Sequence, residues 1–231
     1  KYYIPWNLTV TNNKTDELVY EYNLKLSDKK VFVYFDSTSL GDNIAWMAPV
    51  DEFRKRHEIK NMYCSTFFNE YFEEEYREIT FIPPNIGFDD FDVQYRIPWL
   101  EVGDYNPKDC KAIPLQHLCS SILGEKKYNE VVTKIKVKEK ETELTKPYVA
   151  IGMQSTAQAK YWNNPGGWQA ITDYIKSKGY DVVFVDKHEH FGTEPHMNST
   201  PDNAIKRHER SLDQTIATIN QSEFFIGLGS G

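Results

Sequence analysis

The sequence predicts an α/β protein built from parallel strands and the helices that cover them. Residues 148–151 form an apolar run, a polar loop follows, and residues 169–178 carry apolar side chains at helical spacing. Residues 30–35 form a second continuous apolar run, of the kind found in parallel sheets, and a partly helical stripe follows over 44–53. A strand, a polar loop and a helix in that order make the first step of a nucleotide-binding α/β unit.

Composition restricts the classes of partner and the cellular location that the sequence allows. The chain has 231 residues, enough for one large or two modest domains, and its formal charge of −7 argues against a nucleic-acid partner. Three cysteines without CxxC spacing indicate reduced thiols in a cytosolic protein. The sequence has no apolar run long enough for a membrane span and opens with no signal peptide, so we expect a cytoplasmic location. Because it starts at Lys1 and stops within a functional turn, we expect a fragment.

Four segments are expected along the chain. Alternating residues at 6–10 and 18–24 flank a polar turn and predict a β-hairpin lead-in over 1–28, most simply a packing or dimer element. A first α/β domain covers 29–138, with strands at 61–65, 78–82 and 131–138, helices at 67–75 and 115–123, and an irregular stretch at 85–110. A charged linker without periodicity covers 139–147. The second α/β domain covers 148–231, with a strand at 180–185, a helix at 211–220 and a strand at 223–226.

The loop at 154–168 has the composition of a diphosphate site. It reads Gln-Ser-Thr-x-x-x-Lys-Tyr-Trp-Asn-Asn-Pro-Gly-Gly-Trp, and its hydroxyls, amides and lysine are groups that hold a diphosphate. Pro165 suits the first turn of the following helix, where a missing N–H costs nothing. The unpaired N–H groups of that helix start favour an anion.

This run of residues resembles the core motif of the bacterial autotransporter O-heptosyltransferases, in glycosyltransferase family 9. The resemblance implies a GT-B fold, in which two Rossmann-like domains face a cleft, the first for acceptor and the second for nucleotide sugar. Here the second domain is expected to be incomplete.

The turn Ser39-Leu40-Gly41-Asp42 is similar to the family 9 signature that follows the first strand of the acceptor-side domain. The resemblance implies that Asp42 is the catalytic base, and a carboxylate at a helix start beside a glycine can accept a proton from a hydroxyl. On the residues alone, a helix N-cap is the preferred interpretation of Asp42. The expected cleft residues around it are Thr38, Ser39, Gly41 and Asn43.

The resemblance also implies a set of donor-binding residues. They are Gln154, Ser155, Thr156, Lys160, Trp162, Ser230 and Gly231. Lys160 would stabilise the charge of the departing diphosphate, with a plain surface lysine as the alternative. Trp162 is alternatively a packing residue, the role we expect for Trp168. Gly229 replaces the usual aspartate of the Ser230 turn, so a carboxylate contact to the donor sugar is not expected there.

Metal binding is not expected. Asp89, Asp90 and Asp92 lack the glycine and closing glutamate of a calcium loop, and the acidic run 73–75 reads as a solvated helix face. His188 and His190 could supply ligands but fit a polar loop better.

The resemblance implies an inverting transfer of a sugar, expected to be heptose from an ADP-heptose donor, to a hydroxyl. The acceptor is expected to be serine on a β-rich protein. No cofactor is expected for catalysis. The protein is expected to form a homo-oligomer. Two alternatives stay open: a nucleotide-sugar epimerase on the same fold, and a non-catalytic sugar-nucleotide-binding module.

Overall fold

The computed structural model describes residues 3–84, 90–98, 112–125, 131–155, 158–189 and 200–228. The chain divides into two compact units, Lys1–Lys136 and Val137–Gly231, and each is described by itself. Among the described helices, none combines the length and the apolar character that crossing a membrane requires.

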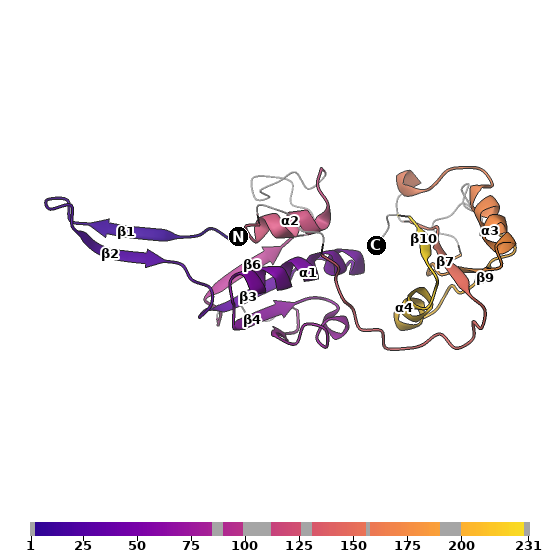
Figure 1. Ribbon diagram of the computed structural model, residues 1–231, viewed down its shortest axis with the longest axis horizontal. Coiled ribbons are helices and arrows are strands. Elements are labelled where there is room, and N and C mark those ends of the chain that lie inside the picture. Colours follow the sequence, from indigo (N-terminus) through magenta and orange to yellow (C-terminus); the bar gives the residue numbers. More distant parts are fainter. Residues whose placement is uncertain are drawn as a thin grey trace. The chain divides into compact units, whose positions relative to one another are not determined.

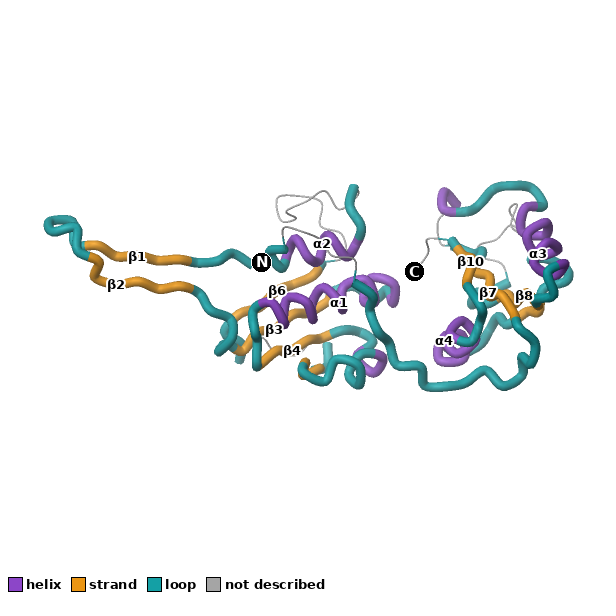
Figure 2. The backbone as a smooth tube through the Cα atoms, viewed as in Figure 1, coloured by secondary structure: helices purple, strands orange, loops and turns teal. Residues whose placement is uncertain are grey.

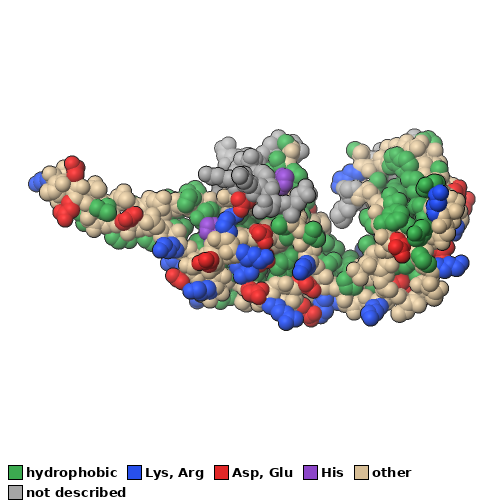
Figure 3. Space-filling model, in the orientation of Figure 1, with side chains coloured by type: hydrophobic (Ala, Val, Ile, Leu, Met, Phe, Trp, Pro, Cys, Tyr) green, Lys and Arg blue, Asp and Glu red, His purple; other side chains and the backbone are tan. Residues whose placement is uncertain are grey.

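The first unit opens with a two-stranded hairpin, in indigo in Figure 1. Strand β1 (Asn7–Thr11) pairs antiparallel with β2 (Leu18–Asn23), which confirms the predicted hairpin. Every residue of both strands is exposed, and Figure 3 shows hydrophobic side chains along the hairpin. The large exposed ones are Ile4, Trp6, Leu8, Val10, Leu18, Val19, Tyr20 and Tyr22.

A four-stranded parallel sheet forms the centre of the first unit, in the order β5-β4-β3-β6 (Figure 2). The strands are β3 (Lys30–Phe35), β4 (Asn61–Ser65), β5 (Ile79–Phe81) and β6 (Val93–Ile97). β3 is buried on both faces, which explains its continuous apolar sequence. The sequence reading missed β6, expecting 85–110 to be irregular. The strand is short, and its pairing with β3 is what holds it extended.

Two helices pack together beside this sheet (Figure 1). Helix α1 (Leu40–Arg56) buries Trp46, Val50 and Phe53, and α2 (Leu115–Ile122) buries Leu118 and Ile122. Gly124 follows α2 at a positive φ of 77°, as expected for a residue that ends a helix. The helix expected at 67–75 is wrong in extent, since only a short 3₁₀ turn, η1 (Asn69–Tyr71), forms there.

The strand predicted at 131–138 is also wrong, because this segment bonds to side chains and helices instead of to a strand. Thr133 Oγ1 donates to Ile44 O at 2.6 Å and accepts from Ala48 N at 3.2 Å. Thr133 therefore inserts into the hydrogen-bond ladder of α1, one turn before Pro49. Tyr76 Oη accepts from Lys134 N at 3.0 Å, which holds the same segment from the other side.

The second unit has a parallel sheet in the order β10-β7-β8-β9. Its strands are β7 (Tyr148–Gly152), β8 (Asp181–Phe184), β9 (Ile205–Lys206) and β10 (Phe225–Gly227). Its helical elements are η2 (Gln158–Lys160), α3 (Gly167–Ser177) and α4 (Leu212–Asn220). Ser211 caps α4 in a capping box with Gln214, as the sequence indicated. β9 was not predicted, since two residues carry no periodic signal.

Within the charged segment 139–147, which the sequence predicts to be a linker, Glu141 is bonded to the second unit. Glu141 is buried, and its Oε2 accepts hydrogen bonds from Arg210 Nη1 at 2.9 Å and Thr218 Oγ1 at 2.8 Å. Gln221 Nε2 donates to Glu141 O at 3.1 Å. Burial alone would raise the pKa of Glu141, but the hydrogen bonds from Glu143 N–H and Thr218 and the charge of Arg210 lower it overall.

Candidate functional site

Asp42 lies in the first turn of α1 and is 8% exposed. The helix begins at Leu40 and its N-cap is Ser39, so Asp42 does not occupy the N-cap position. Its Oδ2 accepts a hydrogen bond of 2.6 Å from Ser37 Oγ. Because Ser37 follows the carboxyl end of β3, the carboxylate stands at the edge of the sheet where ligands bind in α/β proteins.

Asn43 shapes the turn around that carboxylate. It is fully buried, and its Nδ2 donates to Ser37 O at 2.8 Å and to Ser39 O at 2.7 Å. Its Oδ1 has no hydrogen-bond partner among the described residues. Asn43 therefore holds the backbone of the β3–α1 turn through these two hydrogen bonds. Of the other expected cleft residues, Thr38 is exposed and Gly41 is partly exposed.

A second interaction ties the end of β3 to β6. Arg96 Nε donates to Asp36 Oδ2 at 2.8 Å, and the two side chains form an ion pair. This pair joins neighbouring strands at the same sheet edge as Ser37. Neither Ser37 nor Asp36 was among the predicted site residues, although both follow a strand directly.

In the second unit, the strand order reverses at β7, between β8 on one side and β10 on the other. The chain leaves β7 through α3 toward β8 on one side, and returns through α4 to β10 on the other side of β7. Loops after two such strands diverge, and the crevice between their carboxyl ends is where α/β sheets bind ligands. The loop after β7 carries Gln154, Ser155 and Lys160, whereas Thr156, Ser230 and Gly231 lie outside the described residues.

Hydrogen bonds to Asp186, Glu189 and Tyr161 hold the start of this loop. Asp186, just past the end of β8, accepts at Oδ2 from Met153 N at 2.6 Å and from Gln154 N at 3.1 Å. Gln154 Nε2 donates to Glu189 O at 2.8 Å, and Tyr161 Oη donates to Ser155 O at 2.8 Å. Asp186 was missed in the sequence, although a polar residue directly after the apolar run 180–185 was the available signal.

The far side of the loop is built on aromatic packing. Trp162 is 38% exposed and packs edge-to-face on Trp168, with ring centroids 5.4 Å apart. Trp168 is buried in α3, as expected. Pro165 was expected in the first helical turn but precedes the helix, because Gly166 is the N-cap with φ of 69°. Lys160 is exposed, and no ion pair joins it to another described residue.

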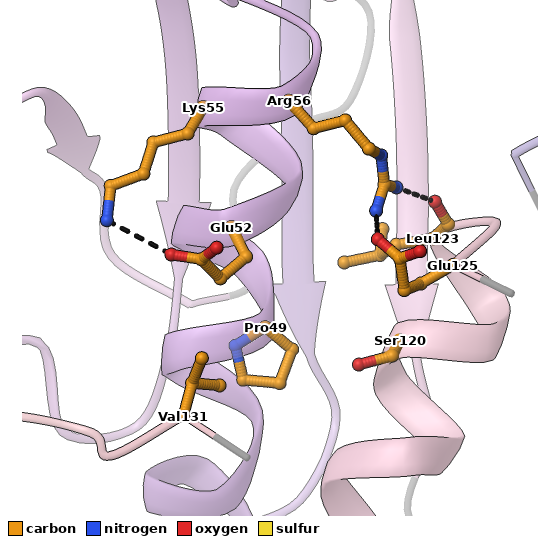
Figure 4. Close-up of a pocket in the computed structure, with 8 residues that line it drawn as sticks. All are labelled: Pro49, Glu52, Lys55, Arg56, Ser120, Leu123, Glu125 and Val131. Carbon is orange, nitrogen blue, oxygen red and sulfur yellow. Dashed lines mark hydrogen bonds and ion pairs between the residues drawn. The ribbon is translucent and has the colours of Figure 1, made fainter. Parts of the chain in front are cut away.

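A pocket of about 400 Å³ lies elsewhere, between the second half of α1 and the end of α2 (Figure 4). Its charges are matched within it: Lys55 pairs with Glu52 at 3.1 Å, and Arg56 pairs with Glu125 and donates to Leu123 O at 2.7 Å. It begins at Pro49, two helical turns beyond Asp42. We therefore do not assign the predicted chemistry to this pocket.

No group of three or more metal-binding side chains gathers within the part of the chain that the structure describes. Cys64 and Cys119 are buried thiols, and burial raises the pKa of each. Cys110, Asp89 and His190 lie outside the described residues.

Comparison with known proteins identifies relatives along the whole chain. No protein-family model matches it. It is 30% identical over 237 residues to the autotransporter heptosyltransferase Aah of Escherichia coli, covering 100% of this chain and 60% of Aah. It is 23% identical over 192 residues, 80% of this chain and 44% of the relative, to BimC of Burkholderia thailandensis, which is named an inactive autotransporter heptosyltransferase.

The structure is similar to that of TibC of enterotoxigenic E. coli, described as a dodecameric, iron-containing glycosyltransferase. In its complex with ADP-D-β-D-heptose, TibC aligns with a TM-score of 0.83 and 27% sequence identity, over 100% of this chain and 61% of TibC. The predicted glycosyltransferase-type α/β fold is thereby confirmed. The chain spans about three fifths of the length of Aah and of TibC.

Proposed function

Because the chain is similar along its whole length to autotransporter heptosyltransferases, we propose that it is the catalytic part of an enzyme of that kind. The reaction is the transfer of heptose from an ADP-heptose donor to a hydroxyl, with inversion. The acceptor is a serine of a β-rich protein. The similarity to TibC, crystallised with ADP-D-β-D-heptose, is the observation that carries the proposal.

In this reaction Asp42 is the base that takes the proton of the acceptor hydroxyl. The Ser37 hydrogen bond supports this role, because it holds Oδ2, while Oδ1 has no hydrogen-bond partner among the described residues. The loop after β7 holds the diphosphate, and Lys160 stabilises its growing negative charge. The loop follows the carboxyl end of β7, where the strand order reverses between β8 and β10, and this position supports the assignment. No cofactor takes part in the proposed proton transfer or diphosphate departure.

The test compares two aspartates of α1 in the full-length protein. Asp42→Asn should slow heptose transfer at least about 100-fold, since general-base catalysis contributes that much, and should leave ADP binding unchanged. Asp51→Asn is the matched control, because Asp51 is also buried on α1 but pairs with Arg54 at 2.9 Å. Equal rates for Asp42→Asn and wild type would remove Asp42 from the mechanism. If the wild-type protein binds ADP-heptose but transfers nothing, the heptosyltransferase proposal fails.

A non-catalytic sugar-nucleotide-binding module is the second candidate. The similarity to BimC, named as inactive, is the observation that favours it. Binding of ADP-heptose without release of ADP, in the presence of acceptor proteins, would support this candidate over the enzyme. The dodecamer described for TibC also leads us to propose a homo-oligomer, which light scattering on the full-length protein tests.

A further inference from the structure

Asp186 accepts hydrogen bonds from two consecutive backbone N–H groups at the start of the loop after β7. Its Oδ2 is 2.6 Å from Met153 N and 3.1 Å from Gln154 N. Its Oδ1 lies against β7, 3.6 Å from the position that a Cβ would take at Gly152. One carboxylate thus joins the ends of the neighbouring strands β7 and β8.

None of the described basic residues forms an ion pair with Asp186. Glu189, on the same segment, pairs with Lys206 of β9, and Lys187 and His188 are exposed. The loop contributes Lys160 and Tyr161, and β10 packs apolar Phe225 beside Gly152. Among the described residues no ion pair reaches Asp186. Burying part of a carboxylate without a cation beside it costs free energy. The hydrogen bonds from the two N–H groups offset part of that cost.

The consequence of these bonds reaches further along the loop. With the backbone at Met153 and Gln154 fixed, the Gln154 amide reaches Glu189 O at 2.8 Å. The next carbonyl, Ser155 O, accepts from Tyr161 Oη at 2.8 Å, so the start of the loop is bonded to its middle. The backbone conformation at Gln154 and Ser155 thus depends on the hydrogen bonds that Asp186 accepts.

We propose that Asp186 is a positioning residue for the nucleotide-sugar donor: it fixes the backbone at the start of the loop after β7, the loop to which the proposed function assigns the diphosphate. This inference rests on the proposed function for its ligand. Asp186 itself contacts the loop and takes no part in bond making.

Hydrogen exchange and ADP titration of the full-length protein test this role together. Asp186→Ala removes the acceptor, so exchange of the Met153 and Gln154 amides should accelerate about tenfold and the Kd for ADP should rise about tenfold, as expected for loss of a charged hydrogen-bond partner. Asp186→Asn keeps an acceptor oxygen, so its Kd for ADP should lie between the wild-type value and that of Asp186→Ala. Asp181→Asn, on the opposite end of β8, is the control and should change neither quantity.

The pH profile separates positioning from general structural support. Burial raises the pKa of Asp186 to about 6, against the lowering effect of its two N–H partners. ADP affinity of the wild type should therefore fall as the pH drops through 6, and Asp186→Asn should lose this step without losing thermal stability at pH 7. If Asp186→Ala leaves amide exchange and ADP affinity at wild-type values, the inference is wrong. If the wild type binds no ADP, the proposed function fails, and amide exchange, which needs no ligand, still decides whether Asp186 sets the loop.

Discussion

Ser37 Oγ donates a 2.6 Å hydrogen bond to Asp42 Oδ2, and both residues are buried at the carboxyl end of β3. The same hydroxyl accepts from Ser39 N at 3.1 Å, so Ser37 connects the Asp42 carboxylate to the backbone of its own turn. Asn43 holds that turn through Ser37 O and Ser39 O. The proposed base is therefore held by Ser37, which precedes it in the β3–α1 turn, and that turn is held by Asn43, which follows it.

Replacing Ser37 should reduce catalysis without unfolding the protein. In Ser37→Ala the Asp42 carboxylate loses its fixed orientation, and kcat/KM for heptose transfer should fall about tenfold, the value of one charge-assisted hydrogen bond. Ser177→Ala is the control, since Ser177 lies exposed at the end of α3, where its Oγ donates to Tyr174 O, and this variant should keep wild-type activity. Ser37→Thr should retain most of the rate because it keeps the hydroxyl. Unchanged kcat/KM in Ser37→Ala would show that this hydrogen bond does not orient the base.

Lys160 should contribute to binding only when the ligand carries phosphate. Lys160→Ala should weaken ADP about tenfold, measured by calorimetry, because a cation close to a diphosphate contributes on this scale, and it should leave adenosine binding unchanged. The weakening should diminish at high salt, where the attraction is screened. Lys178→Ala is the matched control, because Lys178 follows α3 and lies over the Tyr174 ring. Equal losses for ADP and adenosine would indicate that Lys160 supports the loop instead of the phosphates.

Two adjacent glycines should respond differently to alanine. A Cβ at Gly167 would stand 2.7 Å from the Trp162 ring, so Gly167→Ala should displace Trp162 from Trp168 and shift the tryptophan emission spectrum. A Cβ at Gly166 meets nothing within 4 Å, but φ is 69°, so Gly166→Ala should cost about 1 kcal/mol of stability through backbone strain and leave the emission unchanged. Identical spectra for both variants would contradict this packing. If Gly167→Ala also weakens ADP, the displaced Trp162 takes part in donor binding.

The Glu141 network should make stability depend on pH. Its pKa is lowered in the folded state, so its contribution is present above the ordinary value of 4.5 and is lost as the pH falls through the lowered value. Glu141→Gln should reduce the free energy of unfolding by about 2 kcal/mol at pH 7, because Arg210 loses one of its two carboxylates. The difference between variant and wild type should shrink in acid, measured by urea unfolding. Glu139→Gln, on the exposed part of the same segment, is the control. A difference that stays constant from pH 7 to pH 3 would contradict the assignment.

The sequence by itself determined the strongly patterned elements. The apolar runs at 30–35 and 148–151 became β3 and β7, and the helix predicted at 211–220 became α4, with Ser211 as its N-cap. These signals are local, because burial on both faces and helix capping each depend on neighbouring residues. The loop motif at 154–168 was specific enough to indicate relatives that the comparison then identified.

Only the tertiary structure decided which polar residues meet. β6 forms because β3 offers it a partner, and residues 131–136 do not form a strand because Thr133 bonds within α1 and Lys134 bonds to Tyr76. Asp186 is separated from Met153 by 33 positions, and Glu141 from Thr218 by 77. Such pairs leave no periodic signal in the chain, since they depend on how strands and helices are ordered in space. The sequence thus indicated the loop and the carboxylate of the candidate site, while packing determined the residues that hold them in place.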